Sequence, residues 1–86
     1  MYYFYVLRNA QNPDEFYTGS TQDLRRRLTE HNAGRQEATS GRQWEVAYYE
    51  AYQSERVARD RERTIKRNGR MRMLLMNRIK SQWQSD

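Results

Sequence analysis

Cysteine is absent from the 86-residue sequence, and proline occurs only once. The lack of cysteine excludes disulfide bonds, zinc–thiolate sites and cysteine nucleophiles. The chain has no apolar run of about 18 residues, and Met1 is not followed by a basic and then apolar leader. We therefore expect no membrane span and no secretion signal, and an intracellular, cytoplasmic protein.

Aliphatic residues are also scarce. Leucine, isoleucine, valine and phenylalanine together number 12, about 14% of the chain. A fraction below roughly 20% usually indicates disorder. Seven tyrosines, two tryptophans and four methionines compensate, because aromatic side chains bury large areas while keeping a polar group. We expect one folded domain over residues 1–86, since this length leaves no room for a second. The side chains expected to replace the missing aliphatic core are Tyr2, Phe4, Trp44, Tyr48 and Trp83.

Negative charge is scarce in the second part of the chain. The net charge is +5, but residues 1–50 hold six basic and seven acidic side chains, whereas residues 51–86 hold ten and four. Fourteen of the sixteen basic residues are arginines, whose planar guanidinium binds phosphate oxygens in pairs. The basic half is therefore a candidate surface for a polyanion such as nucleic acid. Charge alone leaves open that these arginines are merely solvated.

Three segments rich in aromatic and β-branched residues predict strands, over residues 2–7, 16–18 and 44–52. The first is apolar along its whole length, so we expect both of its faces to be covered. The turn residues between 9 and 14 predict that the first two strands form a β-hairpin. Alternation in the third strand places one set of side chains on a single face: Trp44, Val46, Tyr48 and Tyr52.

Helical periodicity predicts three helices. Ser20 or Thr21 is expected to cap the first, which carries Leu24, Leu28 and His31, and Ser54 to cap the second. The third covers about 71–83, with an apolar stripe that is most simply core: Met71, Leu74, Leu75, Met76, Ile79 and Trp83. The polar segment 34–43 predicts a mobile loop. The fold class is therefore α+β, with a small three-stranded antiparallel sheet flanked by three helices in the order ββαβαα.

Two side chains of the first helix are candidates for binding a phosphate. At about 100° per residue, Arg27 alone of three consecutive arginines flanks the apolar stripe, and it lies four residues before His31, on the same face. An arginine held at the edge of a core beside a histidine is suited to bind a phosphate or a leaving group. The alternative is that Arg27 only extends to solvent and His31 neutralises the helix C-terminus.

Glu62 is an isolated carboxylate at the border of the apolar face of the second helix. Asp60 and Glu55 lie on other parts of that helix, so neither can join Glu62 on one ion. A two-metal nuclease needs several converging carboxylates, whereas one carboxylate suits a single Mg²⁺ that keeps most of its waters. The alternative is that Glu62 pairs with a neighbouring basic side chain on the helix surface.

Tyr5 and Tyr17 are candidates for proton transfer. We expect them to face each other across the hairpin, with Gly19 leaving the backbone open at the strand end. Paired strand tyrosines are more often core. An unperturbed tyrosine with a pKa of ~10 is only about 0.1% phenolate at pH 7, so a tyrosine base needs a cation beside it. Arg27 or a metal ion would supply one.

These residues form a pattern that resembles the GIY-YIG nuclease superfamily. It consists of Tyr3-Phe4-Tyr5, Tyr17-Thr18-Gly19, Arg27, His31 and Glu62. The likeness covers nearly the whole chain and is strongest to the small single-domain members, and the chain is similar also to the nuclease domain of bacterial excision repair protein C. Thr18 stands where the second motif usually has isoleucine. Neither Asn68 nor Asn77 falls convincingly at the position of an asparagine that supports the site in larger members.

The resemblance implies an endonuclease that hydrolyses DNA with one Mg²⁺, or with Mn²⁺, in DNA repair or recombination; RNA is a further potential substrate. By this resemblance, Tyr5 helps deprotonate or orient the attacking water and Tyr17 supports it. Arg27 stabilises the phosphoryl charge, and His31 assists proton transfer or water positioning. Glu62 is the metal ligand.

The basic residues expected to contact backbone phosphate are Arg35, Arg42, Arg59, Arg63, Lys66, Arg67 and Arg70, together with Arg56, Arg61 and Arg72. Larger family members attach a separate DNA-binding domain, so target selectivity here would come from the domain itself or from a protein partner. The first alternative function is a nucleic-acid binding module with the same fold and little or no catalysis. The second is an interaction domain whose basic helix binds an acidic protein partner.

Overall fold

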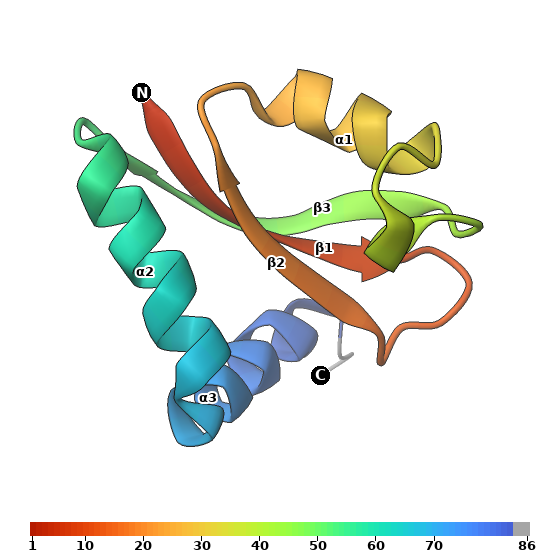
Figure 1. The fold of residues 1–86 in the computed structure, drawn as a ribbon. Helices are drawn as coiled ribbons and strands as arrows, with labels where there is room; N and C mark the ends of the chain where they lie inside the picture. Colours follow the sequence, from red (N-terminus) through yellow and green to blue (C-terminus); the bar gives the residue numbers. More distant parts are fainter. Residues whose placement is uncertain (84–86) are drawn as a thin grey trace.

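The computed structural model describes residues 1–83 and contains one antiparallel sheet (Figure 1). Its strands are β1 (Tyr2–Asn9), β2 (Phe16–Thr21) and β3 (Trp44–Tyr52), in the order β2-β1-β3. The helices are α1 (Leu24–Asn32), α2 (Glu55–Arg67) and α3 (Gly69–Lys80), with two 3₁₀ turns, η1 (Glu37–Thr39) and η2 (Ser81–Trp83). The predicted α+β class and the order ββαβαα are confirmed.

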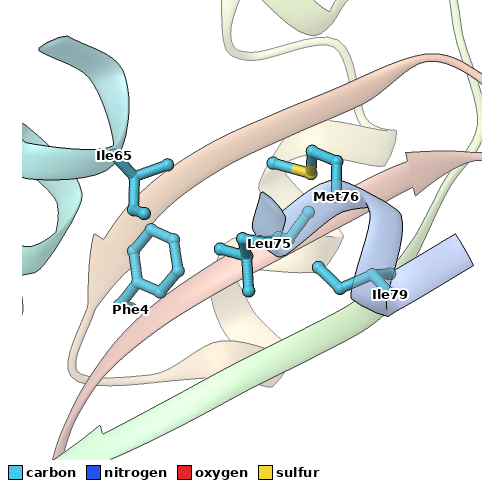
Figure 2. Close-up of a cluster of buried hydrophobic side chains, with 6 residues drawn as sticks. Phe4, Ile65, Leu75, Met76 and Ile79 are labelled. Atoms are coloured by element: carbon cyan, nitrogen blue, oxygen red, sulfur yellow. The ribbon is translucent and has the colours of Figure 1, made fainter. Parts of the chain in front are cut away.

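The central strand β1 supplies side chains to two cores, one on each face of the sheet. Phe4 and Val6 pack against Ile65 of α2 and the buried side chains of α3, as Figure 2 shows for Phe4. Tyr5 and Leu7 point to the other face, where Leu24 and Leu28 of α1 pack. Successive side chains of a strand alternate between faces, so an unbroken apolar run requires cover on both. Figure 1 shows this cover, with α1 on one side of the sheet and α2 and α3 on the other.

A β-bulge in β3 overturns the expectation that its apolar side chains share one face. Val6 pairs with Tyr48 and Leu7 with Val46, so Ala47 is an extra residue between them. Such an insertion switches the alternation of side chains on the bulged strand. Trp44 consequently joins the core under α1, whereas the Tyr48 side chain packs in the core under α2 and α3.

The helix caps follow the expected chemistry, with one correction. Ser54 caps α2 as predicted, because its side chain accepts a hydrogen bond from the backbone of Val57. The cap of α1 is Asp23, not Ser20 or Thr21, because β2 continues through both of those residues.

The apolar stripe of the last helix is only partly core. Leu75, Met76 and Ile79 are buried, but Leu74 is 54% exposed. The expectation that Trp83 replaces core aliphatics is wrong: α3 ends at Lys80, and the Trp83 ring lies on the surface under the Arg8 guanidinium, 3.8 Å from its centroid. No helix within residues 1–83 is both long and apolar enough to traverse a bilayer.

Candidate active site

Tyr5 lies on β1 directly opposite Gly19 of β2. Tyr17 pairs with Leu7 instead, so the expected direct pairing of Tyr5 with Tyr17 is replaced by a diagonal one. The Tyr5 ring occupies the space that a side chain at position 19 would fill, since a Cβ built there would lie 2.6 Å from the Tyr5 Cζ. The lack of a side chain at Gly19, in the segment Tyr17-Thr18-Gly19, thus leaves space for the ring of Tyr5.

The Tyr5 hydroxyl contacts two of the predicted site residues. It lies 2.9 Å from His31 Nε2, and the Nε of Arg27 donates a hydrogen bond to it at 3.4 Å. His31 is fully buried, and its Nδ1 lies 2.7 Å from the Thr39 hydroxyl oxygen. Helix α1 therefore places Arg27 and His31 within hydrogen-bond distance of the same atom, the Tyr5 hydroxyl oxygen.

Tyr17 supports this cluster through its ring. Its centroid lies 5.1 Å from that of His31 in an edge-to-face arrangement and 6.4 Å from that of Trp44. Edge-to-face packing of this kind fixes the plane of the imidazole. The Nζ of Lys66, on α2, lies 5.7 Å from the same ring.

Glu62, on α2, contacts the edge strand β2 from the face of the sheet opposite α1. Its Oε1 accepts a hydrogen bond from the Ser20 hydroxyl at 2.6 Å, and its Oε2 accepts one from Lys66 Nζ at 2.6 Å. Sequence reasoning missed Ser20 as a site residue. Its place directly after Gly19 was visible, but its contact depends on β2 extending to Thr21 and on α2 covering that face.

Burial and charge set the protonation of the cluster. Burial raises the pKa of Tyr5 above its ordinary value of 10.0, although Arg27 acts in the opposite direction. Burial, together with the charge of Arg27, lowers the pKa of His31 below 6.5. Burial by itself would raise the pKa of Glu62, but the hydrogen bonds from Lys66 and Ser20 outweigh it and hold that pKa below 4.5. At neutral pH, Tyr5 is therefore protonated, His31 is neutral and Glu62 is ionised.

Three open hollows share Ser20 in their lining, and two of them are also lined by a predicted catalytic residue. One, of ≈ 390 Å³, is lined by Ser20, Glu62 and basic side chains of α2. The other, of ≈ 380 Å³, is lined by Ser20, Arg27 and residues at the start of α1. Arg27 and Glu62 therefore border adjacent surface depressions on the two sides of strand β2.

A comparison with known protein families matches residues 1–75 to the GIY-YIG catalytic domain. The chain belongs to the GIY-YIG family. No curated protein and no solved structure matches it. Family membership confirms the resemblance seen in the sequence and supports a nuclease-type function in general, with nucleic acid as the substrate. All five predicted catalytic residues lie within the matched range.

The basic residues expected to contact phosphate divide into two groups in this GIY-YIG domain. Four of them line the hollow beside Glu62: Arg59, Arg63, Lys66 and Arg67. Arg35 and Arg70 are exposed but do not line it, and Arg42 is bound to Glu15 and to the carbonyl of Ala38. Arg61 also stands apart, because its guanidinium binds both carboxylate oxygens of Glu50.

The donor set of this GIY-YIG domain fits a metal ion held by one protein ligand. Within residues 1–83, no group of three or more histidine and acidic side chains converges as a metal cage would require. Glu62 offers an ionised carboxylate at the wall of an open hollow. Mg²⁺ is often bound by one or two carboxylates, with waters and substrate phosphate completing its octahedron.

Proposed function

We propose that the protein is an endonuclease that hydrolyses DNA phosphodiester bonds with a single Mg²⁺ ion. The observation that carries this proposal is that Arg27 and Glu62, from helices on opposite faces of the sheet, line neighbouring hollows that share Ser20 at the edge of β2. The Tyr5 hydroxyl lies within hydrogen-bond reach of Arg27. A cation, a carboxylate and a proton-transfer group near the same end of β2 support the proposal.

Each side chain of the proposed site has its own role in the reaction. Arg27, with 30% of its side chain exposed, faces the scissile phosphate and stabilises the charge that develops on it. The attacking water gives a proton to the Tyr5 oxygen as the Tyr5 proton passes to His31 Nε2, 2.9 Å away. The new P–O bond forms as the bond to the leaving oxygen breaks, the leaving oxygen takes a proton from solvent water, and His31 later returns its extra proton to solvent through Tyr5. Tyr17 keeps the imidazole in place.

Glu62 is the residue that would hold the metal, either Mg²⁺ or Mn²⁺. A bound ion supplies Lewis-acid stabilisation of a phosphoryl oxygen and lowers the pKa of a coordinated water. With its pKa below 4.5, the Glu62 carboxylate is charged at neutral pH, and a carboxylate oxygen that accepts from Ser20 still has a free lone pair.

Duplex or branched DNA is the proposed substrate, held by the basic side chains of α2 beside Glu62. Its choice over RNA, and a place in DNA repair or recombination, rest on the sequence resemblance. A protein partner would supply targeting.

The test is nicking of supercoiled plasmid with Mg²⁺, and with EDTA as the blank. We expect Arg27→Ala and Glu62→Gln each to lower the rate by about 10²-fold. Arg25→Ala is a control on the helix of Arg27, and Glu45→Gln is a control at a carboxylate on β3; both positions are exposed, neither lines these hollows, and both variants should cut like the wild type. Equal cutting by all five proteins would identify a contaminating nuclease and reject the proposal.

The second candidate is a nucleic-acid binding module without turnover. It is favoured by one observation: both oxygens of Glu62 are engaged by Ser20 and Lys66 within the protein. In that case Mg²⁺ would have no effect, and Glu62→Ala would tighten DNA binding slightly by removing a negative charge. Metal-dependent product that is lost in Arg27→Ala would exclude this candidate.

A further inference from the structure

His31 lies in the middle of a chain of hydrogen bonds that runs from Arg27 to the backbone of Gln36. Arg27 Nε donates to the Tyr5 oxygen, which lies 2.9 Å from His31 Nε2. On the other side of the ring, Nδ1 lies 2.7 Å from Thr39 Oγ1, and the Thr39 hydroxyl donates to the Gln36 carbonyl at 3.3 Å.

Only one direction of this chain gives every proton an acceptor among the contacts of the described residues. If Thr39 donates to Gln36, its oxygen must accept from His31 Nδ1–H, and the free Nε2 then accepts from the Tyr5 hydroxyl. In the reverse direction, Nε2–H would donate to Tyr5. The proton of that buried hydroxyl would then have no acceptor, at a cost of about 1–3 kcal/mol.

The position of Thr39 is fixed by packing. The residue is fully buried at the end of η1, and its carbonyl accepts a hydrogen bond from the Trp44 indole at 2.9 Å. Asn32, at the end of α1, bonds both backbone groups of Trp44, at 2.6 and 3.0 Å. The hydroxyl of Thr39 is therefore held against Nδ1 by three elements of the fold.

We infer that Thr39 is a positioning residue, which fixes the Nδ1–H tautomer of His31 so that Nε2 is free to accept the proton of Tyr5. The nitrogen that carries the proton in a neutral imidazole is set by the hydrogen bond that the other ring atom makes. The role in proton transfer rests on the proposed nuclease function, but the tautomer itself does not. Thr39 touches neither substrate nor metal in this assignment.

The tautomer is measured on the ¹⁵N-labelled protein without substrate, from long-range ¹H–¹⁵N spectra of the imidazole at a pH where the ring is neutral. His31 is the only histidine of the chain, so its two ring signals are unambiguous. We expect a protonated Nδ1 and an unprotonated Nε2 in the wild type and in Thr39→Ser, which keeps the hydroxyl. Thr39→Val, nearly isosteric but without a hydroxyl, should shift the ring toward the Nε2–H form, with its fold checked by circular dichroism.

Tyr5→Phe provides the second test, because it removes the other partner of the ring and leaves Thr39 in place. We expect it to keep the Nδ1–H form. An Nε2–H tautomer in the wild type, a switch in Tyr5→Phe, or an unchanged tautomer in folded Thr39→Val would each overturn the inference.

Plasmid cleavage then connects the tautomer to the reaction. Thr39→Val should cut about 10²-fold more slowly, and Thr39→Ser should restore the rate. Wild type that shows the Nδ1–H tautomer but no cleavage with any divalent metal would reject the proposed function and leave the tautomer assignment standing. Cleavage by Thr39→Val at the wild-type rate, with its tautomer switched, would overturn the positioning role alone.

Discussion

The close approach of Tyr5 to Gly19 makes a testable demand on a single residue. An alanine at position 19 would place its Cβ 2.6 Å from the Cζ of the buried Tyr5 ring, which is 1% exposed. We expect Gly19→Ala to lower the free energy of unfolding by about 1–3 kcal/mol, as overpacked core substitutions do. The displaced hydroxyl should also move away from His31, so cleavage should fall together with stability. Urea unfolding and plasmid nicking measure the two effects.

Gly69→Ala is the matched control for this substitution. Gly69 begins α3, and a Cβ built there meets no atom within 4 Å. Its replacement by alanine should leave cleavage unchanged and stabilise the protein slightly, by about 0.4–1 kcal/mol, because the unfolded chain loses conformational freedom. Equal stability of the two alanine variants would show that the packing of Tyr5 against position 19 is not a constraint.

For single residues, the sequence predicted which residue types form the candidate site better than it predicted which side chains contact one another. Spacing along helix and strand singled out Arg27 and Glu62 as a lone core-edge cation and a lone carboxylate. Ser20 and Thr39 were missed, because a serine in a strand and a threonine in a polar loop carry no signal of their own. Their contacts depend on which helix covers which face, and this is decided only by the tertiary fold.

At the scale of elements, a half-buried carboxylate joins α2 to the sheet. Glu50 of β3 accepts hydrogen bonds from the hydroxyls of Tyr48 and Tyr52 at 2.6 and 2.5 Å, and from Arg61 of α2 at 2.9 and 3.1 Å. Since α2 carries Glu62, this junction also determines how the proposed metal ligand meets β2. The Arg61 predicted to contact phosphate therefore has a structural role in this arrangement.

We expect Glu50→Gln to lower the free energy of unfolding by about 2 kcal/mol at neutral pH, because hydrogen bonds to a charged group are removed. Glu45→Gln is the control on the same strand. Its ion pair with Arg8 is more exposed, so its removal should cost less than about 1 kcal/mol. Thermal or urea unfolding of both variants provides the comparison, and equal destabilisation would contradict the structural role of Glu50.

The pH dependence of that difference has a definite sign. Burial by itself would raise the pKa of Glu50, but hydrogen bonds from Arg61, Tyr48 and Tyr52 outweigh it and hold that pKa below its ordinary value of 4.5. The contribution of a carboxylate with a depressed pKa is present above 4.5 and is lost as the pH falls through the folded-state value. The difference in the free energy of unfolding between wild type and Glu50→Gln should therefore shrink in acid.

Tyr52 governs the alkaline end. Burial and the hydrogen bond to Glu50 raise the pKa of Tyr52 to about 12. The stability that Tyr52 contributes is therefore lost as the pH rises from 10 toward that value.

Element boundaries were predictable where local chemistry decides them. The cap at Ser54 and the two-sided burial of β1 follow from residue type and periodicity alone. The bulge at Ala47 and the cap at Asp23 were not predictable, because both depend on how far strand pairing extends and where its register shifts. Register is a property of two strands together, which a pattern along one strand does not contain.

At the scale of the whole molecule, the excess positive charge of the second half is partly neutralised on the protein itself. Arg56 and Arg63 pair with Asp60, and Arg59 pairs with Glu55, all at exposed positions of α2. Exposed pairs of this kind are worth at most about 1 kcal/mol, so a polyanion can displace them. The Glu50 pair of Arg61 is less exposed, with 27% and 17% of the two side chains accessible, and is expected to stay closed.

The side of the molecule that we propose to bind DNA is the face formed by α2 beside Glu62, and salt dependence tests this assignment. Arg59 and Arg67 line the hollow that contains Glu62, whereas Arg78 of α3 lines a separate hollow with Met71 and Leu74. Binding of a labelled duplex, followed by fluorescence anisotropy in EDTA over a salt series, should weaken in Arg59→Gln and Arg67→Gln. The slope of log K against log[salt] should fall by about 0.9 for each phosphate that the variant no longer neutralises, since each neutralised phosphate releases a counterion. Arg78→Gln should retain the wild-type slope, and an equal fall in all three variants would mean that the basic charge acts as a diffuse field rather than through a face formed by α2.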